Sequence, residues 1–232
     1  MKFEAFKESV QLSLEGICRD LLAENRDRIK IKKDEVAVRN LARIFEATLR
    51  ISNEKGFASM SLRDLSREAG MSMGALYSYI SSKEELLDMV QQQGRSLIFR
   101  ILGERIKDID DPREKLKAGI QTHLYLSEVV QPWFYFSYME TKNLPKGVHR
   151  KAIEAELFTE RIFADIIEEG MRKGVFRTVD AQMTSAALKA LLQDWYLKRW
   201  KHERRKVAVE EYARFVVDLM DAYLGVNEEK GG

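Results

Sequence analysis

The side chains best placed to contact another molecule lie between residues 61 and 86, at the starts of short helical segments. Ser61 and Asp64 have the spacing of a capping box, which predicts the start of a helix. Gly70 supplies the end of that helix, and Ser72 can cap a second helix only two residues later. Two short helices joined by so brief a turn form a helix-turn-helix, which places its second helix in the major groove of DNA. The spacing therefore predicts a DNA-binding protein.

The second helix of this motif would present small side chains to DNA. With Leu76 and Ile80 facing the core, helical spacing turns outward Met73, Gly74, Ala75, Tyr77 and Ser78. Gly74 and Ala75 have little bulk, so the helix can approach base edges closely, and Ala75 can touch a thymine methyl group. Arg63, near the start of the preceding helix, is the best candidate for a guanine contact.

The same segment carries a longer pattern: Leu65, Ala69-Gly70, Gly74, Leu76-Tyr77, Tyr79 and the run Ser82-Lys83-Glu84-Glu85-Leu86. This pattern resembles the tetracycline-repressor (TetR/AcrR) family of bacterial transcriptional regulators. The resemblance extends back through an apolar-periodic helix over residues 36–55. Ile80 stands where the family more often has an aromatic residue, and Ser78 where a larger side chain is common. Beyond residue 90 the resemblance is architectural, to a larger helical domain of the expected length.

The resemblance implies phosphate contacts from Tyr77, Tyr79 and Lys83, and from Ser61 and Ser72 at their helix N-termini. An alternative for Tyr77 and Tyr79 is a half-buried packing role. The resemblance also implies a regulator that binds a palindromic operator in double-stranded DNA as a homodimer. We expect a repressor that a small effector releases from DNA.

The composition suits a soluble globular protein. The 232 residues are 45% hydrophobic and 33% charged, and 3 prolines and 13 glycines are too few for a loop-rich chain. Cys18 is the only cysteine, which excludes an intrachain disulfide and a cysteine-cluster metal site. No apolar run approaches the roughly 20 residues that cross a bilayer, and residues 1–10 lack the apolar core of a signal peptide. We therefore expect a cytoplasmic protein with no membrane partner.

The residue types give no support for an enzyme. No G-x-S-x-G motif or phosphate-binding glycine loop is present, and Cys18 has no histidine nearby in sequence. The three histidines, His123, His149 and His202, lack the i, i+4 pairing of helical zinc sites. We therefore expect neither catalysis nor a metal or other cofactor.

The net charge of +2 is nearly neutral, so affinity for DNA has to come from local clusters of charge. The best cluster is Arg26, Arg28, Lys30, Lys32 and Lys33. It is interpreted either as an arm that touches phosphates or the minor groove, or as a solvated linker. A second basic run, residues 198–206, is expected to be a solvated face or turn rather than a second DNA site.

Apolar spacing along the rest of the chain predicts helices and no convincing strand. The expected fold is all-α, with a small N-terminal helix-turn-helix head on a larger helical body. We expect an added amphipathic helix and basic arm over residues 1–33, the DNA-binding domain over 34–90, a ligand-binding and dimerisation domain over 91–225, and a flexible tail over 226–232. The amphipathic helix, over residues 3–22, should pack on its own subunit or on a partner.

Several residues mark the expected starts and ends of helices in the predicted body. Asp111 followed by Pro112 opens one helix, and Asp180 caps another. Gly225 ends the last helix. A long helix over residues 82–109 should connect the head to the body.

Two-fold pairing in the family uses the last two helices. Here these helices carry a set of large apolar side chains: Leu188, Leu191, Leu192, Trp195, Phe215, Leu219 and Tyr223. This set is sufficient for a four-helix interface with a second copy. Core packing within one chain uses the same residue types and remains the alternative for each of them.

The segment from residue 132 to 139 is apolar nearly all round, which predicts a helix inside the body. Clustered aromatic side chains with a flexible methionine suit the wall of a cavity for a small apolar molecule. The expected ligand site comprises His123, Trp133, Tyr135, Phe136 and Met139, with polar contacts from Tyr125, Glu140 and Asn143. One alternative is a solid aromatic core. Another is a DNA-binding architectural or scaffold protein that senses no ligand.

Overall fold

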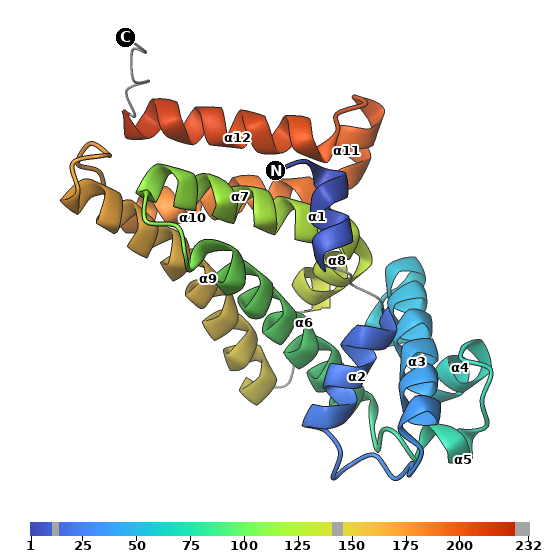
Figure 1. Cartoon of the computed structure of the whole chain (residues 1–232). Coiled ribbons are helices and arrows are strands. Elements are labelled where there is room, and N and C mark those ends of the chain that lie inside the picture. The colour runs from blue at the N-terminus through green and yellow to red at the C-terminus, as the bar shows by residue number, and fades with distance from the viewer. Residues whose placement is uncertain (11–13, 141–145, 226–232) are drawn as a thin grey trace. The chain divides into compact units, whose positions relative to one another are not determined.

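The computed structural model describes residues 1–10, 14–140 and 146–225, and every regular element within them is helical (Figure 1). In chain order the elements are α1 Phe3–Val10, α2 Leu14–Glu24, α3 Asp34–Lys55, the 3-10 helix η1 Phe57–Ser59, α4 Leu62–Glu68, α5 Met73–Leu76, α6 Lys83–Ile106, α7 Pro112–Val129, α8 Gln131–Glu140, α9 Lys146–Arg172, α10 Ala181–Leu197, α11 Arg199–Arg204 and α12 Val209–Leu224. The predicted all-α fold is confirmed. Of the helices described, none combines the length and the apolar character needed to span a membrane.

Contacts between the elements divide the chain into two compact units. The head unit comprises residues 11–97 and 132–153, and the body unit comprises residues 1–10, 98–131 and 154–232. This division departs from the boundaries expected from the sequence, because α1 belongs to the body unit and α8 belongs to the head unit. Both α6 and α9 contribute residues to each unit. The tail expected over residues 226–232 lies outside the described part of the chain.

Within the stretch where the sequence predicts one helix, residues 3–22, the structure describes α1 and the start of α2, and residues 11–13 between them lie outside the described residues. In the body unit α1 packs on α7, where Phe6 is fully buried and its ring meets Tyr125 edge to face at 5.6 Å. In the head unit α2 packs on α3, with Ile17 and Leu21 buried. The same apolar period runs through both helices, so the sequence did not reveal that they serve different units.

The predicted helix boundaries in the body unit are confirmed. Asp111 Oδ1 accepts a hydrogen bond from the Glu114 N–H at 2.8 Å, at the start of α7. Asp180 Oδ1 accepts from the Met183 N–H at 2.9 Å and caps α10. Gly225 ends α12 in the left-handed region, with φ +67°. These signals are local, which is why residue types alone were enough to find them.

The connection from α10 to α11 is fixed by Asp194. Its carboxylate accepts hydrogen bonds from Lys201 and from His202 Nε2 at 3.1 Å, and pairs with Lys198 at 3.0 Å. Partial burial alone would raise the pKa of Asp194, but the hydrogen bonds from Lys201, Lys198 and His202 outweigh it and hold the pKa at about 2. The His202 ring packs on Trp195 at 4.8 Å between centroids. The basic run after α10 therefore includes groups that hold the fold together.

Candidate nucleic-acid interface

Helix α4 begins at the capping box that the sequence predicts. Ser61 Oγ accepts from the Asp64 N–H at 3.1 Å, and the Ser61 N–H donates to Asp64 Oδ2 at 3.1 Å. The hydrogen bonds from Ser61, with a weaker contribution from Lys55, lower the pKa of Asp64 to about 2. Leu65 is fully buried on the inner face of α4, and Arg63 is exposed in its first turn.

The turn between α4 and α5 favours glycine at position 70. Gly70 has φ +62°, in the left-handed region that side chains with a Cβ disfavour. A Cβ built there would lie 2.5 Å from Arg43 Nη2, which donates to the Gly70 carbonyl at 2.8 Å. The Met71 N–H donates to the Ser66 carbonyl at 3.0 Å, and the Ser66 hydroxyl donates to the Met71 carbonyl at 2.6 Å. Hydrogen bonds on both sides therefore fix the turn and the direction in which α5 leaves it.

Helix α5 is short and is anchored by one side chain. Ser72 Oγ accepts from the Ala75 N–H at 3.2 Å and caps the helix, as predicted. A tighter turn follows, in which the Ser78 N–H donates to the Ala75 carbonyl at 3.1 Å. Leu76 is fully buried beneath this turn and holds α5 against the rest of the head unit. Figure 1 shows α5 beside α3 and α4 in this unit.

The outer face of α5 is bare at Gly74. A Cβ built on Gly74 meets no atom within 4 Å, and the residue lies within the helix rather than at a left-handed turn. Glycine is less favourable than alanine in a helix by about 1 kcal/mol, and nothing within the head unit requires it here. Tyr77 is 49% exposed, and Met73, Ala75 and Ser78 are half-buried beside it. The missing side chain therefore leaves room outside the chain rather than inside it.

Tyr79 has the packing role that was the alternative for it. The side chain is 2% exposed, and its hydroxyl accepts a hydrogen bond from Asn40 Nδ2 at 2.8 Å. The resemblance implies a phosphate contact for both tyrosines, but in the turn that follows α5 Tyr79 is buried and Tyr77 is exposed. Of the two tyrosines, Tyr77 is the one available to a partner.

Lys83 stabilises the fold of the head unit and also has a donor available for a phosphate. Its Nζ donates to the carbonyl oxygens of Ala58 at 2.9 Å and Met60 at 2.8 Å, and it lies 4.9 Å from the centre of the Phe57 ring. These contacts join the first residue of α6 to the end of η1. An ammonium group has three donors, so one remains for a phosphate oxygen.

The basic segment before α3 lies next to the end of α5. The Lys30 N–H donates to the Ser78 carbonyl at 3.1 Å, which joins the segment to the turn after α5. Arg26 holds the segment in shape, because its guanidinium donates to the Ile31 carbonyl at 2.6 Å and pairs with Asp34 at 3.2 Å. The side chains of Arg28, Lys30, Lys32 and Lys33 are exposed. Four cations thus adjoin the helix-turn-helix.

The aromatic residues of α8 pack into the head unit. The Trp133 ring stacks on Phe45 at 5.8 Å, and its Nε1 donates to the Val90 carbonyl at 3.1 Å. The Phe136 ring meets Phe57 edge to face at 5.7 Å. Both side chains are at most 4% exposed. The solid-core alternative therefore describes these two residues, because partners distant in sequence occupy the faces that a ligand would need.

The predicted ligand residues are divided between the two units. Tyr135 is half-buried and Met139 is 38% exposed on α8, whereas His123 is buried in the body unit. Glu140 is buried in the head unit and accepts from the Phe57 N–H at 3.2 Å. Asn143 lies outside the described residues.

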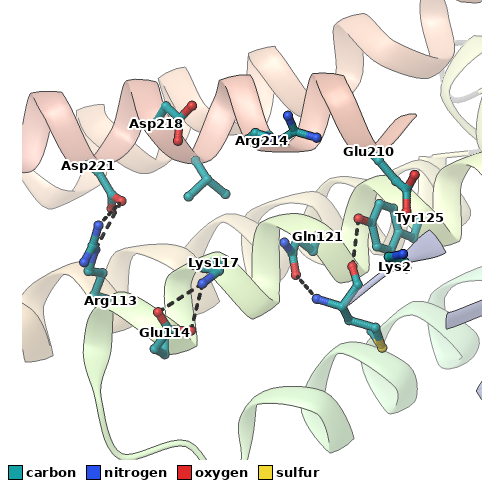
Figure 2. Close-up of a pocket in the computed structure, with 12 residues that line it drawn as sticks. Lys2, Arg113, Glu114, Lys117, Gln121, Tyr125, Glu210, Arg214, Asp218 and Asp221 are labelled. Carbon is teal, nitrogen blue, oxygen red and sulfur yellow. Dashed lines mark hydrogen bonds and ion pairs between the residues drawn. The ribbon is translucent and has the colours of Figure 1, made fainter. Parts of the chain in front are cut away.

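A pocket of about 570 Å³ in the body unit has a charged lining (Figure 2). It lies between α7, α12 and the residues before α1, and none of the side chains expected to bind an apolar molecule lines it except the polar Tyr125. Arg113 pairs with Asp221 at 2.9 Å, and Lys117 pairs with Glu114 at 3.1 Å. The charged groups of the pocket would be costly to bury against an apolar molecule, and the Arg113–Asp221 pair joins α7 to α12.

The residues expected at a dimer interface fall into two groups. Leu188, Leu192 and Trp195 are fully buried in the body unit, and Leu191 is half-buried. Phe215, Leu219 and Tyr223 of α12 are 42–56% exposed. Residues that sequence reasoning missed lie on α10, where Met183 is 71% exposed and Ala187 and Ala190 are exposed. Met183, Ala187 and Ala190 are three to four residues apart and form the outer face of α10. They lie on a different face from Leu188 and Leu192, and this spacing was the signal in the sequence that could have revealed the outer face.

A capped helix-turn-helix with a bare outer helix face, together with a helical unit, defines the class of helix-turn-helix DNA-binding proteins. A family model described as bacterial regulatory proteins of the tetR family matches residues 44–90, and a model of the tetracyclin repressor-like C-terminal domain matches residues 109–223. The chain belongs to the TetR family of transcriptional regulators, whose members are not enzymes.

Known relatives agree with this assignment. The chain is 20% identical over 181 residues to the HTH-type transcriptional regulator HbdR of Aromatoleum sp. (strain CIB), covering 78% of this chain and 79% of HbdR. The crystal structure of the TetR-family regulator PfmR from Thermus thermophilus is similar with a TM-score of 0.70 at 29% identity, covering 81% of this chain and 100% of PfmR. The fold is also similar to that of AibR in complex with isovaleryl coenzyme A and operator DNA, with a TM-score of 0.69 at 20% identity over 78% of this chain and 97% of AibR.

Proposed function

We propose that this regulator is a cytoplasmic repressor that binds a palindromic operator as a homodimer and is released by a small, largely apolar molecule. The observation that carries the DNA-binding part is the bare face of α5 at Gly74, beside the exposed Tyr77. A helix with no side chain at its outer face can lie close to base edges in the major groove. No packing demand within the head unit accounts for this glycine.

The proposed contacts sort into base and phosphate contacts. Ala75 at the surface of α5 and Arg63 in the first turn of α4 are the base-reading candidates, for a thymine methyl and a guanine. Phosphate contacts are assigned to Tyr77, Lys83 and the N-terminal caps Ser61 and Ser72. The exposed side chains of Lys30, Lys32 and Lys33 extend the positive surface beyond α5 and support the arm interpretation.

Homodimer formation is supported by the exposed apolar face of α12. Phe215, Leu219 and Tyr223 are spaced four residues apart on one side of that helix, and about half of each side chain is exposed. Met183 and the small residues of α10 provide a second exposed apolar face in the same unit. Apolar faces of this kind are typical of surfaces buried by a second copy. We therefore revise the proposed interface to these exposed residues and leave Leu188, Leu192 and Trp195 in the core.

Release by an effector is supported by the similarity to AibR, whose structure contains both isovaleryl coenzyme A and operator DNA. A ligand that binds one conformation of the body better than the other would change the spacing of two α5 helices through α6. A DNA-binding scaffold without a ligand is the second candidate. One observation favours it: the rings of Trp133 and Phe136 pack against Phe45 and Phe57 in the core of the head unit, and so do not line a cavity there.

Genomic DNA selection by the purified protein tests the proposal. Fragments recovered by the wild type should share an inverted repeat whose half-sites are about one helical turn apart or more. The Arg63→Ala variant should recover the same repeat with relaxed preference at one position of each half-site. Recovery of fragments without a shared repeat would contradict binding to a palindromic operator.

A further inference from the structure

A lysine lies in the interior of the body unit, where lysine side chains are rare unless paired. The side chain of Lys189, on α10, is 5% exposed. Its Nζ lies 3.4 Å from His123 Nε2 on α7 and 3.4 Å from Glu156 Oε2 on α9. Burial lowers the pKa of Lys189, and the nearby carboxylate of Glu156 opposes that shift.

Among the residues that the structure describes, the ammonium group of Lys189 makes two contacts, and both are long. An ammonium carries three N–H donors, and its hydrogen bonds to charged oxygen acceptors are normally about 2.7–2.9 Å long. Both contacts of Lys189 are longer, near the limit at which a hydrogen bond is counted. A buried donor without a good acceptor destabilises the folded state. Two contacts use two of the three donors of the ammonium group, so a further oxygen atom can accept from the third.

The charges around Lys189 decide which kind of oxygen fits. Glu156 and Glu160 both act on Lys189 electrostatically. His123 is neutral, because burial and the charge of Lys189 lower its pKa well below the usual 6.5. One cation facing two carboxylates leaves the cluster negative, so a carboxylate or phosphate would be repelled. A neutral carbonyl oxygen accepts a hydrogen bond without adding charge.

The cluster also has access to solvent and to apolar surface. The Glu156 side chain is 44% exposed and accepts from Gln193 Nε2 at 2.6 Å, so it leads from the surface toward the buried Lys189. The next residues of α9, Leu157 and Phe158, are 52% and 49% exposed, and Phe158 packs edge to face on Phe99 of α6 at 4.5 Å. These side chains expose apolar surface on the same helix as Glu156, and such a surface suits a hydrocarbon tail.

We infer that Lys189 binds the carbonyl oxygen of a neutral apolar effector such as an ester, thioester or ketone. The inference rests on the proposed function, because it assigns a chemical class to the effector that would release DNA. It places the polar end of the ligand among α7, α9 and α10 of the body unit.

Matched probes with and without a carbonyl group test this assignment. Methyl octanoate, methyl octyl ether and octanoate are titrated into the full chain by calorimetry, with esters, ethers, 2-alkanones and carboxylates of four to twelve carbons completing the panel. The wild type should bind an ester at least about tenfold more tightly than the ether of equal length, as expected for one hydrogen bond to a charged donor. That ratio should fall to near one in Lys189→Met. It should persist in Lys115→Met, a control on α7 whose lysine pairs with Glu169 at 2.9 Å.

An infrared measurement on the wild type needs no variant. The stretch of a ¹³C-labelled ester carbonyl should move to lower frequency on binding, because a hydrogen bond from a cation weakens the C=O bond. An unshifted carbonyl, an ester-to-ether ratio that Lys189→Met leaves intact, or no binding of any ester or ketone in the panel would each overturn the assignment. Tighter binding of octanoate than of its ester would also overturn it, in favour of an anion site. All arms omit DNA, so a chain that binds esters through Lys189 yet selects no operator would retain this site and lose the proposed function.

Discussion

Replacing Gly74 with alanine should stabilise the protein and weaken its binding to DNA. Within the chain the added methyl group meets no atom within 4 Å, so it introduces no clash. Alanine is the better helix former by about 0.5–1 kcal/mol, because glycine loses more backbone freedom on folding. For a chain of this size the midpoint of thermal unfolding should rise by about 1–4 °C.

The effect on DNA should have the opposite sign. If the bare face of α5 lies against base edges, the methyl group overfills that contact, and overpacking of a tight contact costs about 1–3 kcal/mol. The dissociation constant for a selected operator should therefore rise by about 5- to 150-fold. The assay is fluorescence anisotropy of a labelled duplex at fixed salt, beside a thermal unfolding scan of the same preparation.

Gly103→Ala is the matched control. Gly103 lies within α6, belongs to the body unit, and likewise has no atom within 4 Å of a built Cβ. This variant should show the same gain in thermal stability with unchanged affinity for DNA. A Gly74→Ala variant that is stabilised and still binds with wild-type affinity would refute the placement of this face of α5 against DNA.

Three further variants test other parts of the account. Lys83→Ala should weaken binding to all DNA sequences and lower the slope of log affinity against log salt by about 1, because a charge beside the phosphates is lost. It should also reduce thermal stability, because two hydrogen bonds from Lys83 to carbonyl oxygens are lost. Unchanged affinity and slope would show that Lys83 makes no phosphate contact. The double variant Phe215→Glu, Leu219→Glu should be a monomer by analytical ultracentrifugation at micromolar concentration. Leu157→Glu on α9, where the native leucine is similarly exposed, should sediment as the wild type does. A double variant that remains a dimer would exclude the exposed face of α12 as the dimer interface. The pKa of Asp194 lies at about 2, below the usual 3.8, so the ionised carboxylate stabilises the fold above about pH 4 and this stabilisation is lost as the pH falls toward 2. Asp194→Asn should therefore be less stable than the wild type at pH 7 by about 2 kcal/mol and should lose less stability between pH 4 and pH 2. Acid unfolding curves that run parallel for the two proteins would contradict this.

The sequence predicted those parts of the fold that are determined by neighbouring residues. A capping box at Ser61 and Asp64, a cap at Ser72 and a left-handed stop at Gly70 each involve residues at most four apart, so residue type and spacing were sufficient. Helical periodicity likewise separated Leu76 from Gly74 on α5.

Other features depend on contacts between residues far apart in sequence. Whether Trp133 lines a cavity or packs in a core depends on Phe45 and Val90, and no local pattern indicates those partners. On α10 the sequence shows two apolar faces, and only the fold shows that Leu188 points inward while Met183 points outward. Lys189 was missed because a lysine is expected at the surface, and its burial arises from the packing of three helices.

Photo-crosslinking from the surface of α5 tests whether this helix lies against DNA. Benzoylphenylalanine is placed at position 77, where the native tyrosine is 49% exposed, and in a second protein at position 200, where the native tryptophan is 65% exposed on α11 within the other basic run. Each protein is irradiated with operator DNA recovered by the genomic selection. We expect a protein–DNA adduct from position 77 and none from position 200. An adduct from position 200 with none from position 77 would contradict this expectation.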